Sequence, residues 1–369
     1  MKKSLSKLFV IFLTLSTLYV APVLANIDTD IIQEIIQFKL QEQKSAVGVS
    51  IAIIENGDVE YLSFGVADQD SKKKVTPETL FEIGSISKTF TSMALASMVT
   101  EGKVKLSDPV QKFLPAEVKM PARGDKEITL LLLANHMSGL PRLPSNMPFG
   151  DPADPYADYT VELMYDFLNS YTLPRDIDEQ LEYSNLAVGL LGHILSLIDN
   201  KSYEQVINDR VLKPLGMSHS FVDVPGLHLG LLSNGHDASL KQVKHWQLPT
   251  LAGAGAIKSN IQDMAQYLKV NLEPNMDFIQ LTHKQTTGFD NNGDLIANFP
   301  HTNGEVTKAI ADDKNGFYIA GDFTKVDGKQ RGGIAYIDSN NKVTSFFENR
   351  AVDGNVYDME LKDSLLYIA

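Results

Sequence analysis

The segment of residues 85–102 has the pattern of a helix that is apolar on nearly every side. Its apolar positions do not gather on one stripe, and they are Ile86, Phe90, Met93, Leu95, Met98 and Val99. A helix of this kind is usually buried all round, so other parts of the chain must surround it. The pattern therefore predicts a central helix inside a larger helical block.

The segments around this helix predict an α+β fold. Residues 27–43 have the pattern of an amphipathic helix, and residues 47–54 and 59–66 read as strands joined by the hairpin signal Asn56-Gly57. Further helical patterns follow at residues 161–169, 187–199, 203–211 and 261–271. We expect a helical block that packs against an antiparallel sheet begun by the N-terminal strands.

The first 25 residues are interpreted as a secretory signal peptide. Three lysines at positions 2, 3 and 7 precede an apolar run at residues 8–20, and small residues end at Ala25, the expected cleavage point. The alternative is a membrane anchor, but the run is shorter than the ~20 apolar residues that span a bilayer. We expect a periplasmic or secreted protein with no stable membrane anchor after cleavage.

Composition excludes several classes of function. The 369 residues contain no Cys, which excludes disulfides, Cys-ligated metals and a cysteine nucleophile. The formal charge of −13 argues against binding to nucleic acid. The eight His match no metal-ligand spacing and no nucleotide-binding glycine motif occurs, so we expect neither a metal nor a cofactor.

One of four S-x-x-K patterns carries the context of a nucleophile. Only Ser85-Ile86-Ser87-Lys88 follows a turn glycine and opens the buried helix; the other patterns begin at Ser4, Ser71 and Ser339. Backbone N–H groups at a helix start stabilise a developing oxyanion, and residues i and i+3 share one face. Burial would lower the pKa of Lys88 toward the range of a base. The alternative is a helix-capping Ser with an ordinary surface Lys.

A second motif, Tyr183-Ser184-Asn185, is the single Y-x-N of the chain and precedes a predicted helix. A phenol near an ammonium has its phenolate favoured, so Tyr183 is a candidate to take or return the Ser85 proton. The Asn185 amide is a candidate to bridge Lys88 and a substrate carbonyl. The alternative is a turn tyrosine followed by a capping asparagine. Trp246 is interpreted either as a residue of the site or as a packed aromatic.

Together these motifs resemble the class C β-lactamases and their relatives, the D-alanyl-D-alanine carboxypeptidases and serine esterases of the penicillin-binding superfamily. The resemblance covers residues 26–285 and includes three further segments in the family's order: Asn135 to Pro141, Pro214 to Met217 and Ala252 to Gly255. It implies that Ser85 is the acylated nucleophile, that Lys88 and Tyr183 transfer the proton, and that Asn185 positions the substrate. It also implies a small-molecule or peptidoglycan-derived substrate.

The resemblance lacks its third element, K-T-G or H-x-G, which in the family binds the substrate carboxylate and completes the oxyanion hole. His228-Leu229-Gly230 comes too early in the chain, and the segment from Lys284 to Gly288 carries two extra residues. Lys314-Asn315-Gly316 reads as a hairpin turn. We therefore expect an incomplete β-lactamase/transpeptidase-like domain at residues 26–285.

After residue 285 helical periodicity stops, and short β runs are separated by Gly, Asn and Asp. Residues 303–306 and 317–320 are similar to residues 354–356 and 366–369, at an offset of 49 to 50 positions. This repeat predicts a propeller-like β-repeat fragment at residues 286–369, similar to the start of a delta-60-type array cut short. The alternative is an irregular hairpin module with chance similarity. Such a tail either supplies strands to the N-terminal sheet or leaves its edge exposed.

Two functional hypotheses follow. The first is an exported serine hydrolase that acts through an acyl-enzyme on a β-lactam, a D-Ala-D-Ala peptide or a small ester. The second is a catalytically impaired fusion or binding remnant of that family, whose β-repeat tail contacts a surface partner.

Overall fold

The computed structural model describes most of the chain after residue 28. Its described residues are 29–148, 150–284, 286, 288–289, 295–296, 300, 302, 304–312, 316–340, 342–347, 359–362 and 365–368. The predicted signal peptide lies outside them. The chain divides into two compact units, residues 1–45 and 46–369. The first contains α1 (Thr29–Gln41), which confirms the helix predicted at residues 27–43 with slightly shorter bounds. Within these described ranges, no helix is long and apolar enough to span a membrane.

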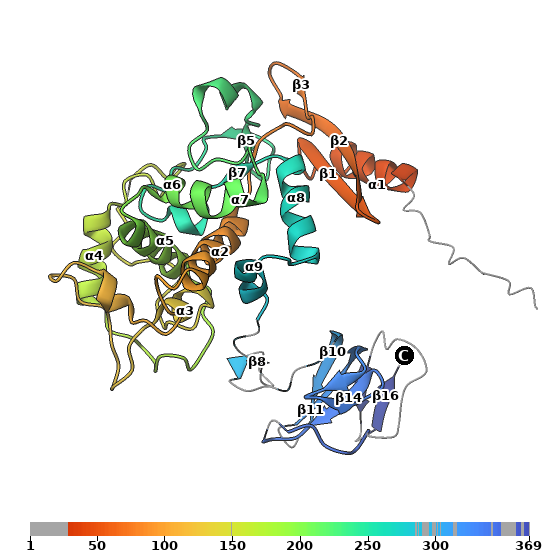
Figure 1. Ribbon diagram of the computed structural model, residues 1–369. Coiled ribbons are helices and arrows are strands. Elements are labelled where there is room, and N and C mark those ends of the chain that lie inside the picture. The colour runs from red at the N-terminus through yellow and green to blue at the C-terminus, as the bar shows by residue number, and fades with distance from the viewer. Residues whose placement is uncertain are drawn as a thin grey trace, which may run out of the picture. The chain divides into compact units, whose positions relative to one another are not determined.

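The predicted N-terminal hairpin is confirmed. β1 (Gly48–Glu55) pairs antiparallel with β2 (Asp58–Asp68), and β3 (Lys73–Lys74) extends the sheet to three strands (Figure 1). Asn56 and Gly57 both have positive φ, 51° and 90°, as the two central residues of a type I′ turn require. The Asn-Gly pair thus fixes the register of the sheet.

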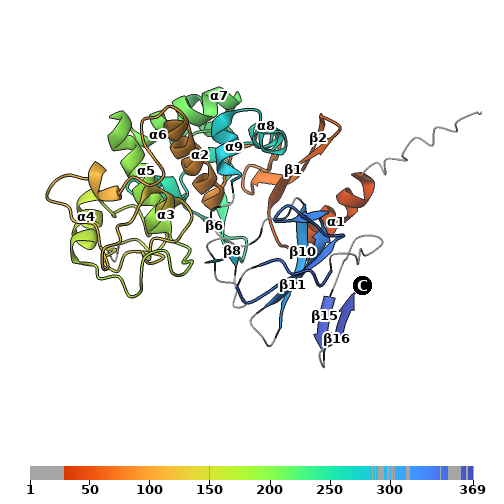
Figure 2. The ribbon, with the colours of Figure 1, turned by 60° about the horizontal axis from the view of Figure 1, so that its bottom comes forward.

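The helix predicted to be apolar all round is buried. A 3₁₀ turn, η1 (Gly84–Ile86), leads into α2 (Ser87–Thr100), which buries ten of its fourteen residues. α2 packs against α3, α5, α6 and α9 and lies within the helical block (Figure 2). Apolar residues lie on all sides of α2 because other helices pack against it from several sides.

The remaining helices complete this block. They are α3 (Leu130–Ala134), α4 (Val161–Ser170), α5 (Asn185–Asp199), α6 (Tyr203–Ile207), α7 (Lys213–Leu215), α8 (Ile261–Leu272) and α9 (Asp277–Thr282). The helix predicted at residues 203–211 is split, because α6 continues into a π-helical turn, η3 (Asn208–Leu212). One hydrophobic cluster runs through the block, and α8 packs against β1 and β2. The helical block thus contacts the N-terminal sheet as expected.

Several short elements lie between the helices along the chain. They are η2 (Val110–Phe113), η4 (Gly226–Leu231), η5 (Ala252–Ala254), β4 (Phe81–Glu82), β5 (Gly235–His236), β6 (Gln242–Val243) and β7 (Lys258–Ser259). β4 pairs antiparallel with β7, which brings the chain just before α2 next to the chain just after η5. This pairing joins two segments that carry sequence motifs.

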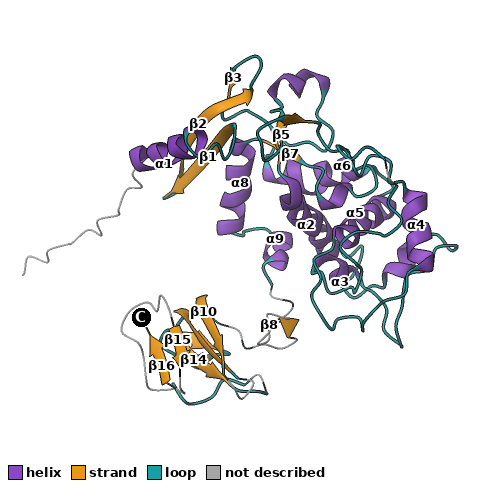
Figure 3. Ribbon diagram, turned by 180° about the vertical axis from the view of Figure 1, so that it is seen from behind, coloured by secondary structure: helices purple, strands orange, loops and turns teal. Residues whose placement is uncertain are grey.

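The predicted change from helices to short strands after residue 285 is also visible in the structure. Helices dominate the described residues up to 282, and the named elements after residue 287 are strands (Figure 3). They are β8 (Gly288–Phe289), β9 (Leu295–Ile296), β10 (Glu305–Ala311), β11 (Phe317–Asp322), β12 (Lys325–Val326), β13 (Lys329–Gln330), β14 (Ile334–Ile337), β15 (Met359–Lys362) and β16 (Leu365–Ile368). Their side chains form two hydrophobic clusters of their own.

The C-terminal strands pair with one another. β10, β11 and β14 form an antiparallel sheet, and Ala311 pairs with Phe317, as the hairpin interpretation of the Lys314 segment requires. Lys314 itself lies outside the described residues. Two of the repeated segments, residues 317–320 and 366–369, fall largely on β11 and β16, each the second strand of a hairpin. Among the described strands no sheet closes, and β1–β3 gain no partner from the tail.

Candidate active site

Ser85 lies at the start of a continuous helical segment. It belongs to η1, directly before α2, and its residue is exposed. Gly84, with φ of +52°, makes the turn into this segment. The chain just before it is fixed by β4 and by a hydrogen bond from the Ile83 N–H to the Ile257 carbonyl, 3.0 Å. A rigid turn thus presents the Ser85 hydroxyl at the amino end of the helix.

Lys88 is placed beside Ser85 by the helical spacing. Its Nζ atom donates to Ser85 Oγ at 3.0 Å and to the Ala254 carbonyl at 2.7 Å. The residue is only 6% exposed. Burial lowers the pKa of Lys88 and the nearby Arg142 charge acts in the same direction, against hydrogen bonding to Tyr183, which raises it. The amine is therefore easier to deprotonate than a surface lysine.

Tyr183 completes the cluster from another part of the chain. Lys88 Nζ lies 4.8 Å from the centroid of the Tyr183 ring. Burial raises the pKa of Tyr183, but hydrogen bonding to Lys88 and Ser85 and the charges of Lys88 and Arg142 outweigh it, so the net pKa is lowered. The structure thus brings Ser85, Lys88 and Tyr183 together. The pKa values of Lys88 and Tyr183 are both lowered, so each group gives up its proton more readily than it would in water.

The loop around His136 holds the tyrosine motif. Ser184 caps α5 by accepting the Ala187 N–H at 2.9 Å and donates to the Pro141 carbonyl at 2.6 Å. His136 Nδ1 accepts the Ser184 N–H at 3.2 Å, and its ring lies 4.6 Å from that of Tyr183. Burial and the Lys88 charge lower the pKa of His136 to about 4, so the ring is neutral and can accept this bond.

Asn185 lines the pocket that also contains Ser85. Its backbone N–H donates to the Arg142 carbonyl at 3.0 Å. Its side-chain Oδ1 is buried and has no hydrogen-bond partner among the described residues. Buried polar atoms are normally paired, so this oxygen is an acceptor still available to a ligand or to water. The capping function that sequence left open belongs to Ser184.

The glycine-rich turn positions the carbonyl that holds Lys88. Thr91 Oγ1 donates to the Gly253 carbonyl at 2.7 Å, which binds η5 to α2. A Cβ on Gly253 would lie 2.6 Å from the Val188 carbonyl oxygen, so only glycine allows η5 to approach α5 this closely. The turn thereby sets the place of Ala254 O and, through it, of the Lys88 amine.

Part of the wall of the Ser85 pocket is formed by loops whose proximity to Ser85 the sequence patterns did not predict. The cavity measures about 190 Å³ and includes Trp246, 48% exposed, whose ring lies 5.3 Å from that of Tyr156. Asp154 accepts the Gln247 N–H at 2.9 Å and fixes this segment. Trp246 is therefore a residue of the site. Tyr156, and Arg142 5.1 Å from the Tyr183 ring centroid, carried no signal in the sequence.

Among the described residues, none that could supply the third family element lines this pocket. The described lining residues lie between Glu82 and Gly255. His228 and Gly230 lie on η4, and Lys284 follows the end of α9. Where the chain is described, no group of three or more potential metal ligands occurs.

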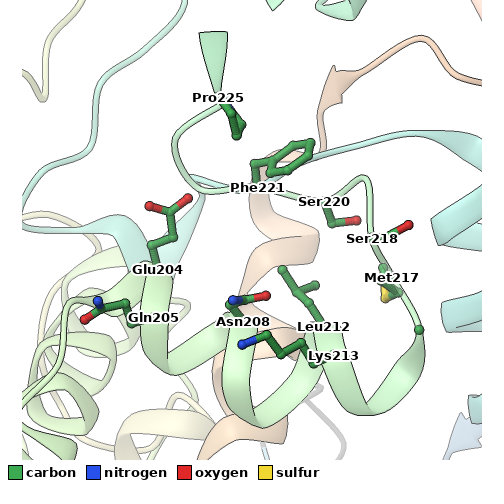
Figure 4. Close-up of a pocket in the computed structure, with 11 residues that line it drawn as sticks. Glu204, Gln205, Asn208, Leu212, Lys213, Met217, Ser218, Ser220, Phe221 and Pro225 are labelled. Atoms are coloured by element: carbon green, nitrogen blue, oxygen red, sulfur yellow. The ribbon is translucent and has the colours of Figure 1, made fainter. Parts of the chain in front are cut away.

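A second pocket, of about 630 Å³, lies between α6, η3 and the loop that follows α7 (Figure 4). Ser218 and Ser220 lie on this loop (Figure 4). Asp263 accepts the backbone N–H of His219 and the Ser220 hydroxyl, both at 2.8 Å, while Ser218 contacts the His219 ring at 3.0 Å. The carboxylate does not orient the imidazole, so these groups are not arranged as a catalytic triad.

Two similar proteins of known name are both β-lactamases. A β-lactamase of Pseudomonas fluorescens is 35% identical over 237 residues, 64% of this chain and 62% of that protein. A β-lactamase of Escherichia coli K12 is 32% identical over 247 residues, 67% of this chain and 62% of that protein. The chain thus spans about 62% of the length of these relatives.

Two solved structures share the fold. A class C β-lactamase from Rhodobacter sphaeroides has a TM-score of 0.59 and 26% identity, over 71% of this chain and 70% of that one. A β-lactamase/D-alanine carboxypeptidase from Pseudomonas syringae has a TM-score of 0.62 and 22% identity, over 71% of both chains, and shows the fold alone.

The fold and the serine–lysine–tyrosine cluster define the β-lactamase/transpeptidase-like class of α+β proteins. The Beta-lactamase family profile matches residues 31–343, so the chain belongs to the β-lactamase family. This match continues past residue 285 and beyond β14.

Proposed function

We propose that this protein is an exported serine hydrolase in which Ser85 forms an acyl-enzyme. The observation that carries the proposal is the 3.0 Å hydrogen bond from the buried Lys88 amine to Ser85 Oγ, beside Tyr183. A hydroxyl is a weak nucleophile unless a neighbouring base takes its proton, and this cluster supplies such a base. The names of the relatives support a β-lactam or a D-alanyl peptide as substrate, and a small ester fits the same chemistry.

The proposed acylation transfers one proton in a closed cycle. Ser85 Oγ attacks the substrate carbonyl carbon while its proton passes to Tyr183, whose phenolate Lys88 stabilises. The carbonyl oxygen becomes an oxyanion facing the backbone donors at the start of the helix. The C–N or C–O bond then breaks, and the leaving group receives the proton. Water repeats the sequence on the acyl-enzyme and releases the acid and Ser85, with the Asn185 amide holding the carbonyl group.

A fluorescent penicillin and two chromogenic substrates test this proposal. We expect covalent labelling of the purified protein, and turnover of a cephalosporin, an arylester or both. Ser85→Ala should abolish labelling and turnover. Ser71→Ala is the matched control, because Ser71 begins an S-x-x-K pattern in an exposed turn and should leave both signals unchanged. A folded protein that shows neither labelling nor turnover contradicts the proposal.

The second candidate is a catalytically impaired member of the family. It is favoured by the pocket lining, which includes no described residue after Gly255 and so no second backbone donor from a facing tail strand. This candidate predicts stoichiometric labelling of Ser85 with no release of the acyl group. The two functions therefore differ in deacylation, the hydrolysis of the acyl-enzyme. The ratio of turnover to labelling measures this step directly.

We also propose that residues 1–25 are a cleaved signal peptide and that residues 286–369 are a β-repeat fragment with a surface partner. The separate hydrophobic clusters of the tail support the second part. N-terminal sequencing of exported protein should begin at Asn26. A chain that ends at residue 285 should still be labelled by penicillin; loss of folding in that chain assigns the tail to the family domain instead.

A further inference from the structure

Two adjacent carbonyl groups of η5 accept hydrogen bonds from side chains of α2. Lys88 Nζ donates to the Ala254 carbonyl and Thr91 Oγ1 donates to the Gly253 carbonyl, both at 2.7 Å and both buried. Each peptide group is rigid and the two share the Ala254 Cα atom, so one cannot move far without the other. Whatever fixes the bond from Thr91 therefore also fixes the oxygen that holds the Lys88 amine.

The Thr91 hydroxyl has one hydrogen and three oxygen neighbours. Its Oγ1 atom lies 2.7 Å from both the Gly253 carbonyl and the Tyr203 hydroxyl, and 3.2 Å from the Ser87 carbonyl. A carbonyl can only accept, so the short contact with Gly253 requires the Thr91 hydrogen. Tyr203 must then be the donor to Thr91. Hydrogen bonds chained in one direction strengthen each other, so this donation favours the bond to Gly253 over the alternative bond to Ser87.

The position and protonation of Tyr203 suit its hydroxyl to this donation. The residue begins α6, whose first turn is capped by reciprocal bonds between Ser202 and Gln205. Its ring packs on Gly192 of α5, where an added Cβ would lie 3.0 Å from both Tyr203 Cε2 and Gly253 Cα. Burial raises the pKa of Tyr203, so the hydroxyl keeps its proton. Two helices thus hold a permanent donor against Thr91.

We propose that Tyr203 is a positioning residue of the serine–lysine site. Its hydroxyl directs the Thr91 hydrogen to η5 and so keeps the Ala254 carbonyl in contact with the Lys88 amine. Tyr203 acts through Thr91 and η5 and is not itself a catalytic residue. The effect on rate rests on the proposed function, whereas the effect on the Lys88 amine requires no reaction.

A second tyrosine–threonine pair on α2 provides the matched control. Tyr267 donates to Thr89 Oγ1 at 2.7 Å, and Thr89 donates to the Ile86 carbonyl at 2.7 Å. Thr89 also belongs to α2, but the carbonyl at the end of this chain lies on η1, directly before α2, and not on η5. Tyr267→Phe therefore removes a hydroxyl bonded to α2 without removing a group that holds η5.

The rate of penicillin labelling tests the effect on the reaction. Tyr203→Phe should lower this rate about 5- to 100-fold, because Lys88 loses its fixed place beside Ser85. Thr91→Val should have a similar effect, and the double variant should lose little more, since both changes break the same chain of bonds. Thr91→Ser keeps the hydroxyl and should restore labelling. Tyr267→Phe should change the rate less than about threefold.

The Lys88 amine reports the same contact in the absence of any reaction. In Ser85→Ala protein that carries lysine enriched in ¹³C at Cε, the Lys88 signal is the one that disappears with Lys88→Met. The negative end of the Ala254 carbonyl favours the ammonium form. The titration midpoint of the Lys88 signal should therefore fall by about 0.4 to 1 pH unit in Tyr203→Phe and remain unchanged with Phe at position 267.

The two measurements separate this inference from the catalytic proposal. A lower midpoint in Tyr203→Phe but not in Tyr267→Phe upholds the positioning role even if penicillin labels neither protein nor wild type. Arg142, Tyr183 and His136 also act on the charge of Lys88 or respond to it, but they are the same in both variants. Equal midpoints in the two variants overturn the role of Tyr203. A normal labelling rate in Tyr203→Phe, where wild type is labelled, also overturns it.

Discussion

Gly253→Ala tests how the fold positions the candidate site. The added Cβ would lie 2.6 Å from the Val188 carbonyl oxygen and 3.1 Å from Gly192 Cα. Both are backbone atoms of α5, so neither can rotate away. Overpacking of this kind typically costs about 1–3 kcal/mol, and we expect the upper value, about 3 kcal/mol. If η5 instead moves away from α5, the Ala254 carbonyl moves with it and weakens its bond to Lys88.

Urea unfolding measures the loss, followed by far-UV circular dichroism and by the fluorescence of Trp246, the one tryptophan of the chain. Gly226→Ala is the matched control, because no atom lies within 4 Å of its added Cβ and its φ is not positive. We expect a change within about 0.5 kcal/mol there. The rate of penicillin labelling should fall in Gly253→Ala only. A loss below about 1 kcal/mol in Gly253→Ala, together with a normal labelling rate, would refute the packing argument.

Three further predictions concern the site and its support. Tyr183→Phe should slow penicillin labelling about 10²- to 10⁴-fold without loss of stability, and an unchanged labelling rate would contradict proton transfer by the phenol. The pKa of His136 is lowered to about 4, so the unfolded state takes up its proton first and stability should fall as the pH drops from about 6.5 toward 4. This loss should be on the order of 2 kcal/mol in urea titrations at pH 7 and 4.5, and absent in His136→Asn. Asp199→Ala should cost about 3 kcal/mol of unfolding free energy, because the buried Arg210 guanidinium loses both of its bonds to Asp199, at 2.5 and 2.8 Å, and keeps only the more exposed Glu101 carboxylate at 3.1 Å. Asp209→Ala, which breaks exposed pairs with lysines, should cost less than about 1 kcal/mol, and equal losses at the two sites would contradict the burial argument.

The sequence by itself determined the local part of the site. Ser85 and Lys88 are three residues apart on one helix, so helical geometry alone places their side chains together. The apolar pattern of residues 85–102 required that helix to be buried, and Asn56-Gly57 required the hairpin between β1 and β2. These are short-range rules, in which the chain's own periodicity fixes the distance between residues.

Only the tertiary structure decided which distant residues meet these groups. The bond from Lys88 to the Ala254 carbonyl joins residues 166 positions apart, and no periodicity encodes it. The same is true of Arg142 at the Tyr183 ring and of Trp246 in the pocket wall. The sequence left two outcomes for the C-terminal strands, and the described ones pair with each other instead of with β1–β3. Such contacts depend on the packing of whole elements, because loop closure can bring many segments to one place and only mutual burial selects among them.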